Sequence, residues 1–225
     1  TPKSKPKREM SIFELMSKAM AGPKENTKLK DDSIAILHLS GAIVDGKEES
    51  PGSIVAGPMV KSIEELIQDD RVKGVVVRVN SPGGSATASE AIRQALDELA
   101  RKKPVVISMG EMAASGGYWV SCIGQPIYAE RGTITGSIGV FSLKLSFGSL
   151  LRRVGVHVES VTLDDSAASN AIDRAWSDSE IGNMQRFIDE VYERFLKLAS
   201  KSRNIPLEKL QSLAGGRVWS GEQAK

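Results

Sequence analysis

Cysteine, histidine and aromatic residues are scarce in this 225-residue sequence, which has one cysteine, two histidines and 5% aromatic residues. Because Cys122 is the single cysteine, an internal disulfide is excluded, and we expect this residue to be a small buried hydrophobe. No uninterrupted apolar run approaches the roughly 20 residues that a membrane-spanning helix needs. The overall composition is that of an ordinary globular protein, large enough for one domain with appendages. We expect neither a metal nor a cofactor.

Positive charge is concentrated at the beginning of the chain. Residues 1–31 contain eight Lys and Arg against four Asp and Glu, whereas the other residues contain 22 against 24. The basic character therefore belongs to a leader and argues against a nucleic-acid-binding core. Within this leader, residues 10–20 can form a short amphipathic helix, which is more typical of a docking helix or connector than of a membrane-surface helix. The sequence predicts a leader over residues 1–31 and one domain over residues 32–225.

Short apolar strands alternate with amphipathic helices through most of the proposed domain. We expect strands at residues 34–39, 75–79, 105–109, 127–129 and 156–161, and helices at residues 60–68, 88–101, 115–122, 147–154, 178–202 and 206–213. This alternation favours an α/β fold built of parallel β-α units, with a sheet covered on both faces. Ser220 to Gln223 has capping-box spacing, which predicts a helix start close to the end of the chain and therefore a truncated domain.

Ser115 is the residue on which the functional interpretation depends. It follows the expected strand 105–109 and a turn of small residues, and it precedes Gly116 and Gly117 at the start of an expected helix. A strand, a tight turn, a serine and a helix can present an activated hydroxyl beside free backbone N–H groups. Two other glycine-bearing turns, at residues 82–84 and 136–139, also follow expected strands. Because functional groups gather at the carboxyl ends of parallel strands, the first two turns could form an oxyanion hole.

A serine nucleophile needs a proton acceptor, and the sequence offers no convincing one. His38 and His157 lie in strand-like segments without a clear carboxylate partner, so we do not expect a Ser-His-Asp triad. A desolvated lysine is the other route. Lys102 and Lys103 precede the strand that leads to Ser115 and so lie at its wrong end, which leaves Lys144 as a weak candidate.

Four segments together resemble the signal peptide peptidase A (protease IV) family of serine peptidases, whose spiral fold of β-β-α units is shared with the Clp protease and crotonase groups. These segments are residues 40–43, 78–84, 112–119 and 135–139. The resemblance implies that Ser115 is the nucleophile and that the N–H of Gly116 donates to the oxyanion. It also implies a second donor from Gly83 or Gly84.

The stretch that carries the general-base lysine in single-domain members of this family contains no lysine here. It corresponds to Asp164 to Arg174, and no lysine occurs anywhere between Lys144 and Lys197. Long family members contain two tandem copies of the fold, with the lysine in the first copy and the serine in the second. The chain resembles the second copy, so the resemblance implies a Ser/Lys dyad completed by a lysine-bearing partner domain or subunit.

The resemblance further implies hydrophobic peptides as substrates, signal peptide remnants among them. It implies a homo-oligomer and, for the full-length protein, association with the inner membrane of a bacterial cell envelope. Two alternatives stay open. The first is a crotonase-like acyl-CoA enzyme, with Glu111 as its carboxylate, and the second is a catalytically silent scaffold half of an oligomer.

Overall fold

The computed structural model describes residues 31–158, 169 and 171–225. The expected amphipathic helix at residues 10–20 lies outside them, as does most of the expected strand at residues 156–161. Within the described ranges, no helix is long and apolar enough to cross a membrane. The strands and helices follow one another in the order β1 (Ser33–Ser40), β2 (Ala42–Val44), β3 (Ser53–Val55), α2 (Ala56–Gln68), β4 (Val72–Ser81), α3 (Ala86–Lys102), β5 (Val105–Ala114), α4 (Gly116–Ser121), β6 (Ile127–Tyr128), β7 (Ile134–Gly136), α5 (Gly148–Arg153), α6 (Asp178–Arg203), α7 (Leu207–Leu213) and β8 (Val218–Ser220).

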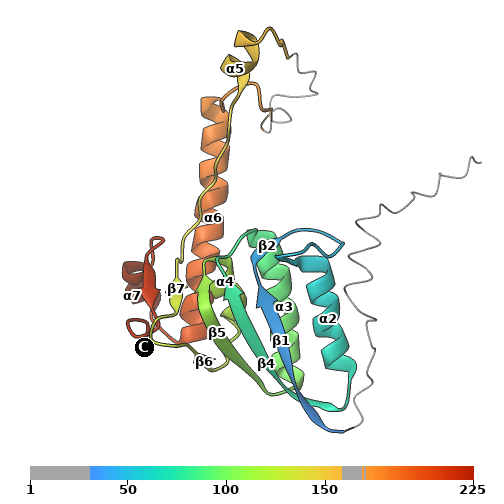
Figure 1. Ribbon diagram of the computed structural model, residues 1–225. Coiled ribbons are helices and arrows are strands. Elements are labelled where there is room, and N and C mark those ends of the chain that lie inside the picture. Colours follow the sequence, from blue (N-terminus) through green and yellow to red (C-terminus); the bar gives the residue numbers. More distant parts are fainter. Residues whose placement is uncertain (1–30, 159–168, 170) are drawn as a thin grey trace, which may run out of the picture.

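The main sheet has the strand order β1-β4-β5-β7-β8, and β6 also pairs with β5. All of its pairings are parallel except the one between β7 and β8. The parallel β1, β4 and β5 end side by side, so their carboxyl ends point in one direction (Figure 1). The predicted mixed α/β architecture with a mostly parallel sheet is confirmed.

Helices α2 and α3 cover one face of this sheet, and the main core lies between them and the strands. Alternate residues of β4 and β5 point into this core, which is why the strands are rich in β-branched and other aliphatic side chains. The fully buried strand and helix residues of this core include Leu39, Val77, Val79, Ile92, Leu96 and Ile107.

The opposite face of the sheet is open in the part of the chain that the structure describes. Ile34, Ile36 and Tyr128 are 71%, 61% and 62% exposed. The expectation of a sheet covered on both faces is therefore wrong for the described residues. Strands β1 and β4 carry apolar side chains on both faces. This pattern predicts that both faces are covered, but it does not identify the element that covers each of them.

Helix α6 and the segment before it form an arm that projects from the sheet. Figure 1 shows α5 at the far end of α6, reached by an extended segment that runs alongside this helix. The N-terminus of α6 is fixed by a capping box, in which Glu180 N–H donates to Ser177 Oγ and Ser177 N–H donates to the Glu180 carboxylate. Hydrogen bonds from Arg174 and from the Ser177 N–H hold the pKa of the Glu180 carboxyl well below its usual range. The C-terminal half of α6 packs on α4 and α7 around Phe195 and Leu196.

Two local predictions differ from the structure. The segment from Gly110 to Ala114, expected to be a turn, continues β5. After a register shift it pairs with β4 again at Ala113, and from Met112 onward it also pairs with β7. The chain after Ser220 forms turns rather than a helix, because residues 218–220 are committed to the antiparallel strand β8.

Candidate active site

Ser115 occupies the single residue between the end of β5 and the start of α4. Its backbone has φ 50° and ψ −118°, a conformation that a residue with a side chain rarely adopts. Its N–H donates to the carbonyl of Gly136 in β7 at 2.9 Å, and its carbonyl accepts from Trp119 N–H at 2.8 Å. Backbone strain of this kind costs on the order of 1–3 kcal/mol and clusters at functional sites. The turn sets the serine hydroxyl at the carboxyl end of a buried strand.

The turn at Pro82-Gly83-Gly84 lies against Ser115 so closely that only glycine fits. A Cβ on Gly83 would stand 2.5 Å from the nitrogen of Gly116 and 2.8 Å from Cβ of Ser115. A Cβ on Gly116 would in turn stand 3.1 Å from the nitrogen of Gly84. The backbones of two sequence-distant turns therefore meet beside the serine.

Two backbone N–H groups at this junction have no hydrogen-bond acceptor among the described residues, those of Gly84 and Gly116. Gly116 is the first residue of α4, where a helix leaves its N–H groups without an intrahelical partner. The N–H of Gly83 is different, since it donates to Ser81 Oγ at 3.1 Å. A pair of fixed N–H donors can stabilise a developing negative charge on a carbonyl oxygen.

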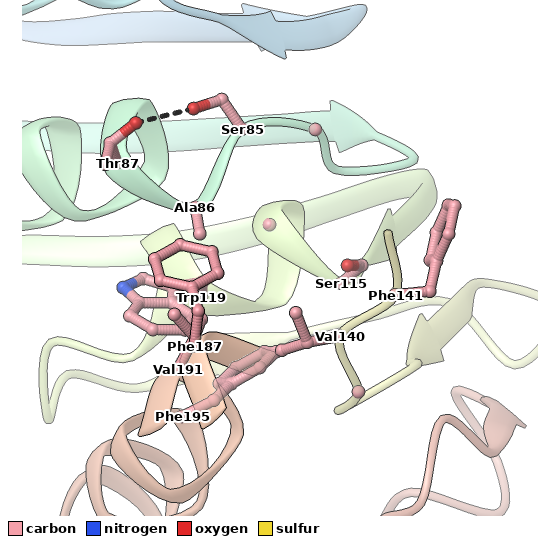
Figure 2. Close-up of a pocket in the computed structure, with 13 residues that line it drawn as sticks. Ser85, Ala86, Thr87, Ser115, Trp119, Val140, Phe141, Phe187, Val191 and Phe195 are labelled. Carbon is pink, nitrogen blue, oxygen red and sulfur yellow. Dashed lines mark hydrogen bonds between the residues drawn. The ribbon is translucent and has the colours of Figure 1, made fainter. Parts of the chain in front are cut away.

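An apolar pocket of about 310 Å³ opens beside Ser115 (Figure 2). Trp119 of α4 and three side chains of α6 line one side of it, and the segment after β7 lines another. The apolar side chains around it are Ala86, Trp119, Val140, Phe141, Phe187, Val191 and Phe195. A larger groove of about 780 Å³ continues past Ser115 on the side of Pro82, Ser137 and Tyr192. The pocket and the groove share Ser115, so an extended chain could run through the groove with one side chain in the pocket.

The two histidines and Glu111, the carboxylate of the acyl-CoA alternative, lie away from the pocket and the groove at Ser115. His38 is exposed on β1 and His157 is exposed beyond α5, and neither lines the pocket or the groove. Glu111 is exposed on β5 and does not line them either. The site therefore provides no support for a histidine triad or for Glu111 as an acyl-CoA carboxylate.

The candidate lysines are engaged away from the serine. Lys144 Nζ donates to the carbonyl of Ser169 at 2.8 Å and lies 5.8 Å from the ring centroid of Trp176. Lys103 precedes the amino end of β5, and its Nζ donates to the carbonyl of Leu66 in α2. As far as the described residues go, no lysine lines the pocket or the groove at Ser115.

Sequence reasoning did not identify the α6 side of the site. Phe187, Val191 and Phe195 belong to the helix expected at residues 178–202, and they form a wall of the pocket although they lie more than 70 positions along the chain from Ser115. Asp45 was also missed: it accepts hydrogen bonds from Ser85 and Thr87, which line the pocket entrance. No local motif marks either contribution, because both depend on the packing of distant elements.

Comparison with known proteins identifies relatives of this chain. A family profile described as peptidase family S49 matches residues 97–225, and one described as Clp protease matches residues 42–131. The chain is 39% identical over 196 residues to Protease 4 of Haemophilus influenzae and 42% identical over 194 residues to Protease 4 of Salmonella typhi. It is 34% identical over 197 residues to "Serine protease SPPA, chloroplastic" of Arabidopsis thaliana.

These alignments cover 86% of this chain but only 31%, 31% and 29% of the respective relatives, so the chain spans about a third of their length. The Clp protease match agrees with the mostly parallel sheet and its helices, and the predicted fold class is confirmed. The resemblance seen in the four sequence segments is confirmed as well, since the matching profile covers more than half of the chain. The chain belongs to peptidase family S49.

Proposed function

We propose that this chain is the nucleophile-bearing part of a serine/lysine peptidase, with Ser115 as the nucleophile and the N–H groups of Gly84 and Gly116 as the oxyanion hole. The observation that carries the proposal is the strained turn that holds Ser115 beside these two N–H groups, at the junction of pocket and groove. Gly83 is the weaker candidate for a donor, because its N–H already donates to Ser81 Oγ.

In the proposed reaction, Ser115 Oγ attacks the carbonyl carbon of a peptide bond while its proton passes to a neutral lysine amine. The carbonyl oxygen becomes an oxyanion held by the two N–H groups. The C–N bond then breaks, the leaving amine takes the proton from the lysine, and the acyl group stays on Ser115 Oγ. Water hydrolyses this ester by the same route, with the lysine again accepting and returning the proton.

We propose that the general-base lysine comes from another domain or subunit. The support is that no lysine or histidine of the described residues lines the pocket or groove, and that Lys144 is engaged by Ser169 and Trp176. The chain also spans about a third of the length of its relatives, which leaves room for a second fold copy.

The proposed substrates are apolar peptides, cleaved signal peptides among them. The pocket beside Ser115 is lined mainly by aliphatic and aromatic side chains, which favour an apolar residue before the scissile bond. The groove supplies space for an extended main chain on the other side of the serine.

The proposal is tested by labelling the full-length protein with a fluorophosphonate probe and locating the modified residue by mass spectrometry. We expect the probe on Ser115 and loss of both labelling and peptide cleavage in Ser115→Ala. Labelling that persists in Ser115→Ala would overturn the nucleophile, and absence of any labelling would favour the scaffold alternative. Turnover of CoA esters that survives Ser115→Ala would favour the acyl-CoA alternative.

The split site is tested separately with the isolated chain. We expect little or no cleavage by residues 1–225 alone and restored cleavage when the lysine-bearing part is added. Full turnover by the isolated chain that is lost in Lys144→Ala would refute the split site and identify Lys144 as the base.

We further propose that the protein assembles into a homo-oligomer through the arm, and that the full-length form is associated with the bacterial inner membrane. The segment before α5 carries exposed apolar side chains at alternate positions, with Phe141 88%, Leu143 75% and Leu145 59% exposed. Exposed apolar patches of this kind are typical of interaction surfaces. Family resemblance supports the membrane association. Leu143→Ser should lower the oligomeric mass in analytical ultracentrifugation, and an unchanged mass would contradict the role of the arm.

A further inference from the structure

We propose that Glu90 and Arg194 form a clamp that fixes α6 against α4 and thereby sets the size of the pocket beside Ser115. The inference rests on the proposed peptidase function, because the pocket matters only if it receives a substrate side chain. Glu90 and Arg194 are positioning residues in this account, since neither touches the reacting atoms.

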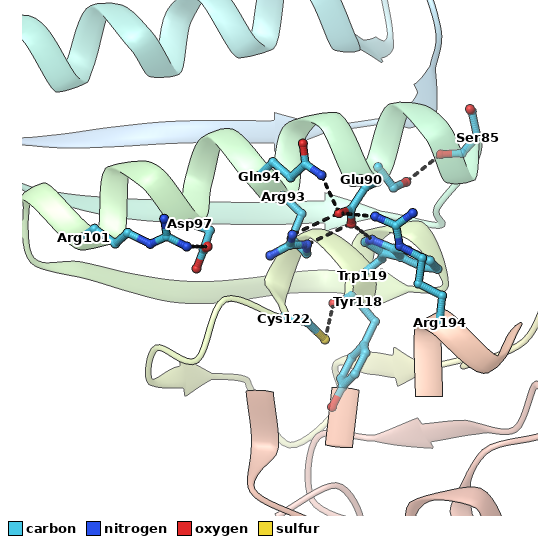
Figure 3. Close-up of polar contacts among 11 residues, drawn as sticks. Ser85, Glu90, Arg93, Gln94, Asp97, Arg101, Tyr118, Trp119, Cys122 and Arg194 are labelled. Atoms are coloured by element: carbon cyan, nitrogen blue, oxygen red, sulfur yellow. Dashed lines mark hydrogen bonds and ion pairs between the residues drawn. The ribbon is translucent and has the colours of Figure 1, made fainter. Parts of the chain in front are cut away.

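Glu90 joins side chains from three helices (Figure 3). Its Oε1 accepts hydrogen bonds from Arg194 Nη2 of α6 at 2.7 Å and Gln94 Nε2 of α3 at 2.9 Å. Its Oε2 accepts from Trp119 Nε1 of α4 at 2.8 Å and Arg93 Nε at 2.9 Å. Only 14% of the Glu90 side chain is exposed. One carboxylate therefore links the helix that carries it to the two helices that line the pocket.

Trp119 is held from two sides by this arrangement. Its indole N–H is bound by Glu90, and its ring packs on Phe195 of α6 with centroids 4.6 Å apart. Only 3% of Trp119 is exposed, yet the residue lines the pocket beside Ser115. The indole can shift only if the carboxylate or α6 shifts with it.

Helix α6 supplies the facing wall of the pocket through Phe187, Val191 and Phe195 (Figure 2). Within the described part of the chain, the Arg194–Glu90 pair is the ion pair that connects α6 to α3. The distance between α6 and Trp119 therefore depends on the Arg194–Glu90 pair and on the packing of Phe195 and Leu196 with α4 and α7.

Glu90 keeps its charge at neutral pH. Burial raises the pKa of the Glu90 carboxyl, but the hydrogen bonds from Arg93, Trp119 and Gln94 outweigh this effect and lower the pKa to about 2. Arg194 is 60% exposed, so the pair contributes little to overall stability. Loss of Arg194 should therefore alter the pocket without unfolding the protein.

The test measures kcat/KM of the full-length protein on peptides that differ only in the residue before the scissile bond, with Leu or Phe at that position. Arg194→Ala should raise the Phe-to-Leu ratio of kcat/KM by about three- to tenfold, because a released α6 widens the pocket. Glu90→Gln should shift the ratio in the same direction.

Arg101→Ala is the matched control. Arg101 is also an exposed arginine bound to a carboxylate of α3, with Arg101 Nη2 at 2.6 Å from Asp97 Oδ2, but it does not line the pocket. We expect this variant to have the same Phe-to-Leu ratio of kcat/KM as the unsubstituted protein. A fluorine signal from 5-fluorotryptophan at Trp119 should move in Arg194→Ala and stay in place in Arg101→Ala.

The outcomes distinguish the two proposals. Cleavage that depends on Ser115 but shows the same Phe-to-Leu ratio in Arg194→Ala and Arg101→Ala overturns the clamp and leaves the peptidase proposal standing. Absence of any Ser115-dependent cleavage in the unsubstituted protein overturns the peptidase proposal and, with it, the role of the clamp in specificity.

Discussion

The backbone N–H of Ser115 donates a 2.9 Å hydrogen bond to the carbonyl of Gly136, which joins the end of β5 to β7. This bond helps to hold Ser115 at φ 50°, where a side chain is unfavourable. Substitution by glycine should relieve the strain, whereas substitution by alanine should keep it. We predict that Ser115→Gly is more stable than Ser115→Ala by about 1 kcal/mol, although both lack the hydroxyl.

Thermal and urea unfolding of the two variants measure this difference directly. Ser115→Ala serves as the control, because it removes the same oxygen without changing the preferred backbone conformation. Equal stability of the two variants, or a less stable glycine variant, would contradict the strain assigned to this turn.

Gly116 is packed against Ser89 so tightly that a side chain must displace something. A Cβ on Gly116 would stand 2.5 Å from Ser89 Oγ, and Ser89 is fully buried. We predict that Gly116→Ala destabilises the protein by about 1–3 kcal/mol through overpacking. Its N–H should also shift, so kcat should fall by about 100-fold or more if Gly116 donates to the oxyanion.

A double-mutant cycle with Ser89→Ala separates the two effects. Removing Ser89 Oγ should recover about 0.5 kcal/mol or more of the stability lost in Gly116→Ala. Gly182→Ala is the control, because Gly182 lies in α6 and, apart from neighbouring residues and the backbone of this helix, no heavy atom of the described residues lies within 4 Å of its added Cβ. Strictly additive losses in the cycle would show that Ser89 is not what the new methyl group meets.

The strand–turn–helix unit around Ser115 could be predicted because its signals are local. β-branched and apolar residues mark the strand, and the glycines mark the close approach of Gly83 and Gly116. The extension of β5 through Gly110 to Ala114 could not be predicted in this way. Its hydrogen-bond partner there is β7, so the conformation of these small residues is decided by a strand about 20 positions further along.

The pocket wall that α6 supplies could not be predicted from the sequence either. An apolar stripe predicts that a helix packs on something, but it does not identify the partner. Here the partner is Trp119 of α4, and the specific contact depends on Glu90 and Arg194, which read in the sequence as ordinary charged helix residues. The turn at Ser115 and the glycines packed against it were therefore predictable, whereas the α6 wall of the pocket was not.

Cys122 provides a probe of unfolding. Its thiol is 1% exposed at the end of α4, and burial raises its pKa to about 12. The thiol is therefore protonated and inaccessible in the folded protein, and a thiol reagent should react at least 100-fold more slowly than with the unfolded chain. A pKa above the ordinary value means that this group favours the folded state below about pH 9 and that the contribution is lost as the pH rises towards 12.

The measurement is the rate of reaction with a chromogenic disulfide reagent, with and without denaturant. Cys122→Ser is the control for reaction elsewhere, and it should show none because the sequence has no other cysteine. Rapid labelling of the folded protein at neutral pH would contradict the burial of this residue.

The carboxyl of Glu90, with its pKa lowered to about 2, should give the protein an acid-sensitive contact between α3, α4 and α6. A pKa below the ordinary value of 4.5 means that the stabilisation is fully present above about pH 4.5 and is lost as the pH falls towards 2. Glu90→Gln has no charge to lose, so its stability should decline less across this range. We expect the difference to be about 1 kcal/mol, because water around the exposed Arg194 weakens the pair.

Urea unfolding of both proteins at pH 5, 4 and 3 measures this difference in stability, with Asp97→Asn as a control on the same helix. If the free energy of unfolding falls equally with pH in Glu90→Gln and in the unsubstituted protein, the Glu90 contacts do not depend on its charge.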